Sequence, residues 1–305
     1  MTVQLSQRQA NTILLGIGLM LLSVLIYTVS NGFGKYLIGV MPVGEVLVLR
    51  GATAIVLMTP LYWRAGVAVF RNAPNKKLHF IRMAISALEI AAFYGAITYL
   101  PLANAMTFWM ATPIYVTALS VIFLGERVGW RRWTAVVVGF VGVAFAMHPS
   151  AEMLTGPVLI GLFGGMIYAC VLLATRSLRQ SADVVLISSS LVGSMFIGLM
   201  MMLILRTEWV TPRPFDLAIF VVMAMFFIGG ALCTNRSLKL APASVVVPFQ
   251  YTQIIWGMLV GYIFFNEVPE PLTLVGAALI IGAGIYIFMR EQAVAKRAPL
   301  PAEPQ

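Results

Sequence analysis

Two ionisable side chains lie inside long apolar stretches of the sequence, where a charge is difficult to hold. Glu89 falls near the middle of segment 80–100, and Arg50 falls in the first half of segment 44–63. Such groups in a membrane-like stretch are costly, so each is a functional candidate. Glu89 would couple protons or bind a substrate amine, or else be a protonated carboxyl bonded to a neighbouring helix. Arg50 would bind a substrate carboxylate or form an ion pair with Glu89 or Glu45, and we favour the ion pair.

Polar and aromatic side chains recur beside these charges at helical spacing. The sets with a spacing of three are Trp109, Thr112 and Tyr115, and then Gln250, Gln253 and Trp256. Tyr27 and Asn31 are four residues apart, so they also share one helical face. Tyr168 lies in a later apolar segment, at the position that corresponds to Tyr27 in the internal repeat described below. Lipid cannot satisfy polar groups, so these faces should point inward. They predict a pocket with aromatic walls for a planar or partly apolar solute, against the alternative that they only bond between helices.

The elements that position these residues must be membrane helices. The chain has 305 residues, of which 60% are hydrophobic and 10% charged, and its mean hydropathy is +0.93. Soluble proteins carry about 25% charged residues. We predict an all-α membrane protein with ten spans. The predicted spans are 12–34, 44–63, 80–100, 103–124, 132–149, 156–175, 184–205, 217–237, 243–265 and 271–289. The first run is too long for the core of a cleaved signal peptide.

The basic residues fall between the apolar runs and not along one face, which argues against a nucleic-acid partner despite the net charge of +9. With ten alternating spans, sixteen of the twenty basic residues, Arg82 among them, lie on the side of the N-terminus. Cytoplasmic loops of membrane proteins are enriched in Lys and Arg. We therefore predict a multi-pass protein of the cell inner (plasma) membrane with both termini in the cytoplasm.

The chain also contains an internal repeat. A shift of 141 residues superposes Tyr27 on Tyr168, Lys35 on Arg176, Pro101 on Pro242 and Glu126 on Glu267. Five helices in each half give the halves opposite orientation, a plan common in secondary transporters. The predicted units are residues 1–150, residues 151–292 and a disordered cytoplasmic tail, 293–305. Glu126 and Glu267 each stand between two predicted helices, which favours a capping role.

Several runs resemble a known family. Tyr-Leu-Pro-Leu-Ala-Asn-Ala at 99–105 and Phe-Leu-Gly-Glu-Arg-Val-Gly-Trp-Arg-Arg-Trp at 123–133 are similar to the EamA-type drug/metabolite transporter superfamily. The second half repeats the pattern at 240–244, 264–269 and 276–280. The resemblance implies two five-helix repeats around a central cavity lined by helices one, three, four, six, eight and nine. Members carry amino acids, flavins, nucleotide-like compounds and other metabolites.

We predict a secondary transporter of a small organic metabolite with a planar aromatic part, such as a riboflavin-like flavin or an aromatic amino acid. The alternative is a broader exporter of amino acids or amphipathic drugs. An intramembrane enzyme is the rival of another class, but we see no aspartyl pair, zinc motif or Ser–His dyad among Asp183, Asp216, His79 and His148. Neither a channel filter nor a phosphate loop is visible. We expect no cofactor and no metal; the partners are the solute and the bilayer, with monomer and homodimer both open.

Overall fold

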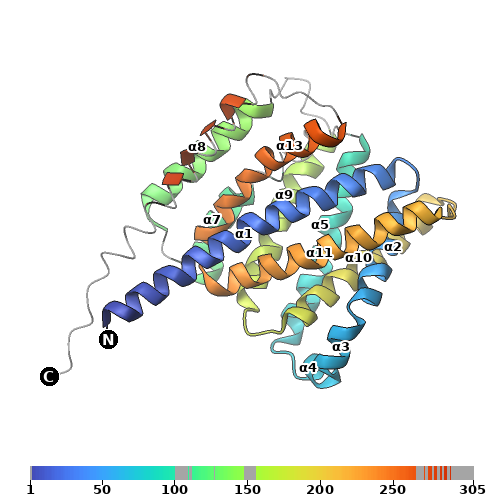
Figure 1. Cartoon of the computed structure of the whole chain (residues 1–305), viewed down its shortest axis with the longest axis horizontal. Coiled ribbons are helices and arrows are strands. Elements are labelled where there is room, and N and C mark those ends of the chain that lie inside the picture. Colours follow the sequence, from blue (N-terminus) through green and yellow to red (C-terminus); the bar gives the residue numbers. More distant parts are fainter. Residues whose placement is uncertain are drawn as a thin grey trace.

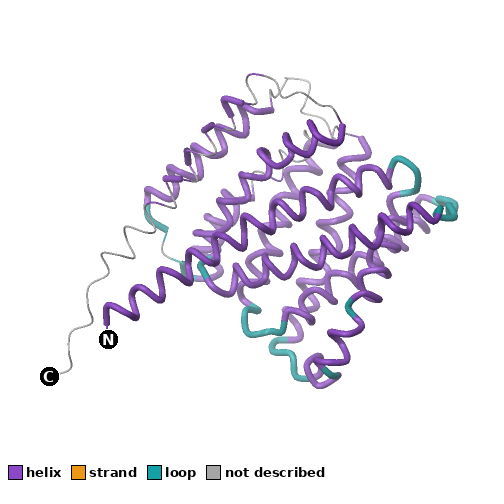
Figure 2. Tube along the Cα trace, in the orientation of Figure 1, coloured by secondary structure: helices purple, strands orange, loops and turns teal. Residues whose placement is uncertain are grey.

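The computed structural model describes residues 2–99, 109, 112–126, 128–147 and 156–265, with scattered positions between 271 and 289. Every regular element in these ranges is a helix, as Figure 2 shows. The predicted all-α fold is confirmed for this part of the chain. Pro101, Glu267, His148 and the predicted tail 293–305 lie outside the described residues.

The helices follow the apolar segments of the sequence. Their bounds are α1 Thr2–Ile38, α2 Val43–Leu57, α3 Thr59–Ala65, α4 Val67–Arg71, α5 Lys76–Tyr99, α7 Thr112–Leu124, α8 Trp130–Met147, α9 Gly156–Ser177, α10 Asp183–Leu205, α11 Pro214–Leu240, α12 Ala243–Val246, the 3₁₀ segment η2 Val247–Thr252 and α13 Gln253–Phe265. Most begin within a few residues of a predicted span. The largest departure is α1, which starts at Thr2 and so includes the polar N-terminal residues.

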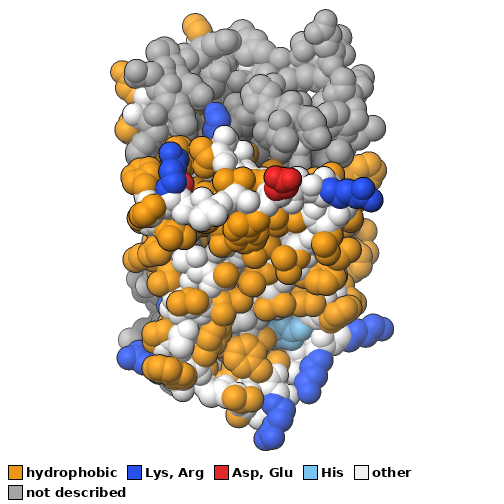
Figure 3. All heavy atoms as spheres, turned by 90° about the vertical axis from the view of Figure 1, so that its right-hand side faces the viewer, with side chains coloured by type: hydrophobic (Ala, Val, Ile, Leu, Met, Phe, Trp, Pro, Cys, Tyr) orange, Lys and Arg blue, Asp and Glu red, His pale blue; other side chains and the backbone are white. Residues whose placement is uncertain are grey.

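Five helices of the described residues are long and apolar enough to cross a membrane, and six if the bent pair α2 and α3 is one span. Two further apolar helices, Thr112–Leu124 and Phe163–Ser177, are shorter. Ten spans and the inverted relation of the halves therefore stay predictions. Figure 3 shows a broad band of hydrophobic side chains with basic side chains above and below it. Within α10, Phe196 is 64% exposed and Leu203 is 72% exposed, as expected of lipid-facing positions.

Helices of the first half pack mainly on helices of the second half. Helix α1 runs along α11 (Figure 1), α2 packs on α10, and α5 packs on both α9 and α10. Small residues allow the closest of these contacts: a Cβ added at Gly44 of α2 would lie 2.6 Å from the carbonyl oxygen of Gly198 in α10. The main hydrophobic clusters contain residues from both halves. The core therefore lies between the two halves rather than within each.

Proline sets the starts of two helices and breaks one of them. Pro42 and Pro242 precede α2 and α12 with nearly the same backbone angles (φ −58°, ψ 142° and φ −56°, ψ 142°). Pro248 then follows within two residues of the start of η2, where it cannot donate a backbone hydrogen bond. The α12–η2–α13 segment is therefore a broken helix. Irregular backbone of this kind is tolerated at membrane depth where it is buried in protein or lines a cavity.

Glu126 caps a helix, as expected, but the helix is one from the other half of the chain. Its carboxylate accepts hydrogen bonds from the backbone N–H of Ala243 (3.0 Å) and Ser244 (3.1 Å), and from the Ser244 hydroxyl (2.5 Å). A carboxylate at a helix N-terminus satisfies donors that have no partner within the helix. Glu126 thereby connects the end of α7 to the start of α12, 117 residues along the chain.

Candidate functional site

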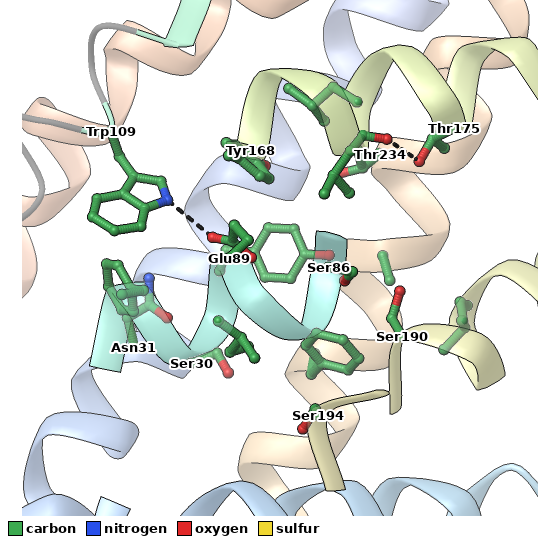
Figure 4. A pocket seen from close by; sticks show the side chains of 18 of the residues that line it. Ser30, Asn31, Ser86, Glu89, Trp109, Tyr168, Thr175, Ser190, Ser194 and Thr234 are labelled. Carbon is green, nitrogen blue, oxygen red and sulfur yellow. Dashed lines mark hydrogen bonds between the residues drawn. The ribbon is translucent and has the colours of Figure 1, made fainter. Parts of the chain in front are cut away.

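A cavity of about 160 Å³ lies between the halves, walled by α1, α2, α5, α9, α10, α11 and the broken segment η2–α13. Eight of the eleven candidate residues line it. They are Tyr27, Asn31, Arg50, Glu89, Trp109, Tyr168, Gln250 and Gln253. Seven of them come from six different elements, and the eighth is the single described residue Trp109, so only the tertiary fold brings them together. Figure 4 shows several of these side chains around the cavity.

Three candidates do not line the cavity. The Thr112 hydroxyl donates to the carbonyl oxygen of Gly165 (3.1 Å), and Tyr115 and Trp256 pack against a hydrophobic cluster. A spacing of three keeps side chains on one face only where the helical period is close to three residues. Gln250 lies in the 3₁₀ segment η2, which has about 3.0 residues per turn, whereas within α13 the step from Gln253 to Trp256 falls about 60° short of a full turn. Gln250 and Gln253 therefore line the cavity, while Trp256 packs against the hydrophobic cluster.

Glu89 and Trp109 form the contact at one end of the cavity. The indole Nε1–H of Trp109 donates to Glu89 Oε1 at 2.9 Å, which Figure 4 marks with a dashed line. The Trp109 ring also meets Phe93 edge-on, with ring centroids 5.0 Å apart. A side chain at position 164 would overlap the Trp109 indole, so the glycine at this position leaves room for the ring. Glu89 is thus held beside a wall of aromatic rings.

Tyr168 and Gln250 supply a second polar contact, from α9 and η2. Gln250 Nε2 donates to the Tyr168 hydroxyl at 3.0 Å. The other amide atom, Gln250 Oε1, is buried with no hydrogen-bond partner in the described part of the chain, and the same holds for Asn235 Nδ2 on the same cavity wall. Buried polar atoms of this kind are rare in native proteins. The cavity therefore presents both an amide acceptor and an amide donor.

Arg50 forms no ion pair with either expected carboxylate. Its guanidinium carbon lies 4.7 Å from the centre of the Phe227 ring and 5.8 Å from that of Tyr94. Glu45 instead accepts a hydrogen bond from the backbone N–H of Val210 (2.9 Å) in the segment before α11. The ion pairs among the described residues do not include Arg50. The ion-pair interpretation is therefore not seen, and Arg50 is held by aromatic faces.

Arg82 is a cavity residue that the sequence interpretation placed in a cytoplasmic loop. It lies in α5, is only 5% exposed, and donates from Nε to Thr175 Oγ1 at 2.7 Å. Its Nη1 donates to the carbonyl oxygen of Leu186 (2.9 Å) and to the hydroxyls of Ser189 and Ser190 (3.2 and 3.1 Å). A usable signal was its spacing of four from Ser86 and seven from Glu89, which puts the three on one helical face.

The sequence interpretation also missed a contact between His79 and Ser181. His79 Nε2 lies 2.9 Å from Ser181 Oγ, so a Ser–His pair does exist in the fold. A separation of 102 residues hid it from spacing arguments. The Nδ1 atom is buried without a hydrogen-bond partner, whereas the His of a Ser–His–Asp triad is oriented through Nδ1. The pair fastens α5 to the turn before α10, beside the Lys239–Asp183 ion pair (2.6 Å).

Comparisons with known proteins identify the family and the fold. A sequence profile of the EamA-like transporter family matches the chain twice, over residues 14–147 and 155–290. A solved crystal structure superposes with a TM-score of 0.74 at 16% identity, covering 93% of this chain and 98% of that one, which is a likeness of fold.

Three curated relatives carry transporter names. The S-adenosylmethionine uptake transporter of Rickettsia conorii is 24% identical, covering 94% of this chain and 96% of its own length. The riboflavin transporter of Rhizobium johnstonii is 25% identical over 81% of this chain and 80% of its own length. The pseudopaline exporter of Pseudomonas aeruginosa is 25% identical over 89% of this chain and 95% of its own length. The three names specify different solutes and both directions of transport.

Proposed function

This chain belongs to the EamA-like transporter family, and we propose that it carries a small organic metabolite with a planar part through the cavity between its halves. The chain is a membrane transporter of that family, and its relatives are named as transporters and not as enzymes. The single observation that carries the proposal is the contact between Glu89 and Trp109 on the cavity wall. It places one carboxylate beside an aromatic surface on the cavity wall.

A planar solute is supported by the rings around Glu89. Trp109, Phe93 and Tyr168 line one region of the cavity, and a planar group can pack against their faces or edges. The cavity volume of about 160 Å³ is well below the roughly 300 Å³ at which pockets for drug-sized ligands begin. In this conformation it accommodates only part of a flavin-sized solute. The volume therefore favours a solute the size of an aromatic amino acid, or one whose entry widens the cavity.

A broader exporter of amino acids or amphipathic drugs is the second candidate. Hydroxyl and amide groups outnumber charges on the wall, as Ser30, Ser86, Ser190 and Ser194 illustrate. Such groups accept and donate hydrogen bonds with little demand on a particular solute. A relative named as an exporter, at 25% identity, is compatible with this reading.

Alternating access would use the two repeats as moving units. We propose that they are inverted copies, with both termini in the cytoplasm and the cavity near the bilayer midplane. The broken segment α12–η2–α13 supports this because a 3₁₀ stretch within a helix often marks a hinge. Transport would be driven by a gradient, either of protons or of the solute.

The test is uptake into vesicles that contain the purified full-length protein. The panel contains tryptophan, S-adenosylmethionine and riboflavin, each measured with and without an imposed proton gradient. We expect at least one of them to accumulate above protein-free vesicles. Replacement of Glu89 by Gln, which keeps the shape and removes the charge, should lower that uptake by about tenfold or more, because hydrogen bonds to charged groups are worth about 1.5–3 kcal/mol.

Glu208→Gln is the matched control, since it makes the same chemical change at an exposed position in the segment between α10 and α11. It should leave uptake at the wild-type rate. Equal uptake by the Glu89→Gln and wild-type proteins would place the solute elsewhere. No uptake of any panel member above the protein-free background would contradict the proposed solute class.

A further inference from the structure

The cavity has an excess of positive charge. Among the described residues on its wall, those that carry a charge in water at neutral pH are Arg50, Arg82 and Glu89. Two guanidinium groups therefore face one carboxylate. In a water-poor interior an unbalanced charge is costly, and a ligand of opposite charge reduces that cost. The wall is thus suited to a solute that brings a negative group.

Of the two arginines, Arg82 already has its hydrogen-bond acceptors in the protein. Nε and Nη1 donate to Thr175, Leu186, Ser189 and Ser190. These contacts fix the Nε and Nη1 atoms of Arg82 to α9 and α10, so these two nitrogens hold helices together.

Arg50 is the opposite case. It is only 4% exposed, yet its Nε–H is buried with no hydrogen-bond partner among the residues that the structure describes. The guanidinium lies against the rings of Phe227 and Tyr94 and forms a side-chain hydrogen bond with Tyr94, while its Nε–H is left without an acceptor among the described residues. An unmade hydrogen bond of a buried charged group costs more than that of a neutral one. Arg50 lies on a cavity wall with this hydrogen bond unmade, which indicates that a bound ligand supplies the acceptor.

We propose that Arg50 binds the carboxylate of the transported solute, an inference that rests on the proposed function. A planar guanidinium can bind a carboxylate through two parallel N–H···O hydrogen bonds. A phosphate group carries more negative charge and would need a second cation to balance it. The Nε and Nη1 atoms of Arg82 already donate hydrogen bonds to the protein. With Glu89 on the same wall, the class of solute is a carboxylate that also carries a cationic or hydrogen-bond-donating group, together with a planar part. A zwitterionic amino acid derivative has this pattern.

The experiment compares an acid with its carboxamide. Purified full-length protein in lipid nanodiscs is titrated with tryptophan and tryptophanamide, and with S-adenosylmethionine and its carboxamide. The wild-type protein should bind the acid about tenfold or more tightly than the amide, as expected for a hydrogen bond to a charged group. Arg50→Met should bring the acid-to-amide ratio close to one while the amide still binds. Arg50→Lys, which keeps the charge and loses the planar pair of donors, should give an intermediate ratio.

Arg64→Met is the matched control, because Arg64 is exposed in α3 and should keep the wild-type ratio. An unchanged ratio in both Arg50 variants would overturn the proposal, as would equal weakening of acid and amide, which is the mark of a purely structural role. Should Arg50→Met fail to fold, Arg50→Lys decides by the same ratio. A wild-type protein that binds acid and amide equally tightly, while it still takes up a panel solute in the vesicle assay, would refute the role of Arg50 alone. A wild-type protein that takes up no panel solute in the vesicle assay would refute the proposed function itself.

Discussion

Two regions of one cavity wall hold an arginine in different ways. Around Arg82, helices α9 and α10 supply four hydrogen-bond acceptors, three of them side-chain hydroxyls. Around Arg50, helices α5 and α11 supply aromatic faces, and a buried Nε–H has no partner. Both side chains are about equally buried, at 5% and 4% exposure. Burial alone therefore does not distinguish a structural charge from one that is available to a ligand.

The carboxylates repeat the contrast. Glu126 accepts three hydrogen bonds at the start of α12, while the described contacts of Glu89 contain one, from Trp109. A buried charge whose hydrogen bonds are made by the protein contributes to folding. A buried charge whose hydrogen bonds are incomplete can instead be stabilised by hydrogen bonds from a bound solute. Changes at Arg82 and Glu126 should consequently affect stability, and changes at Arg50 and Glu89 should affect transport.

The largest difference in stability should appear between Arg82→Met and Arg50→Met. Arg82→Met removes four hydrogen bonds, each worth about 0.6 kcal/mol in a membrane protein, so unfolding should become easier by about 2 kcal/mol. Arg50→Met removes a charge that is incompletely solvated, and its unfolding free energy should change by less than about 1 kcal/mol. Reversible unfolding in mixed detergent micelles measures both. Equal losses in the two variants would remove the distinction between the two regions.

A smaller effect is expected at the carboxylates. Glu126→Gln keeps one acceptor but loses the charge at the start of α12, so it should cost about 1 kcal/mol of unfolding free energy. Glu89→Gln keeps the acceptor for Trp109 and should stay within about 0.5 kcal/mol of the wild type. The same unfolding assay applies. A Glu89→Gln variant less stable than Glu126→Gln would reverse the roles assigned to them.

The fold could be predicted further than the site. Apolar runs, prolines and basic clusters are local features, and they placed most of the helices and the start at Pro242. The family follows from motifs that recur in both halves. The capping role of Glu126 was also readable, but its partner α12 was not, because no local pattern says which helix end lies nearby.

The site required rotational information that spacing by three does not contain. A wall built from α1, α2, α5, α9, α10 and α11 depends on how each helix is turned, and a small error in phase moves a residue out of the cavity. Arg82 was assigned by its charge to a loop, although its long side chain is buried by contacts from α9 and α10. The hydroxyls that make this possible, on Thr175, Ser189 and Ser190, looked like ordinary helix residues in the sequence.

The smallest effect separates the two tryptophans that the sequence analysis places in the same predicted pocket. Trp109 Nε1 donates to Glu89, whereas Trp256 Nε1 is buried with no hydrogen-bond partner among the described residues. Phenylalanine retains most of the ring and removes only the donor. Trp109→Phe should therefore cost about 0.6 kcal/mol of stability and slow uptake several-fold, since the hydrogen bond orients the carboxylate. Trp256→Phe removes an unsatisfied donor and should be neutral or slightly stabilising, with uptake unchanged. Uptake that falls more in Trp256→Phe than in Trp109→Phe would mean that the solute path runs along the other face of α13.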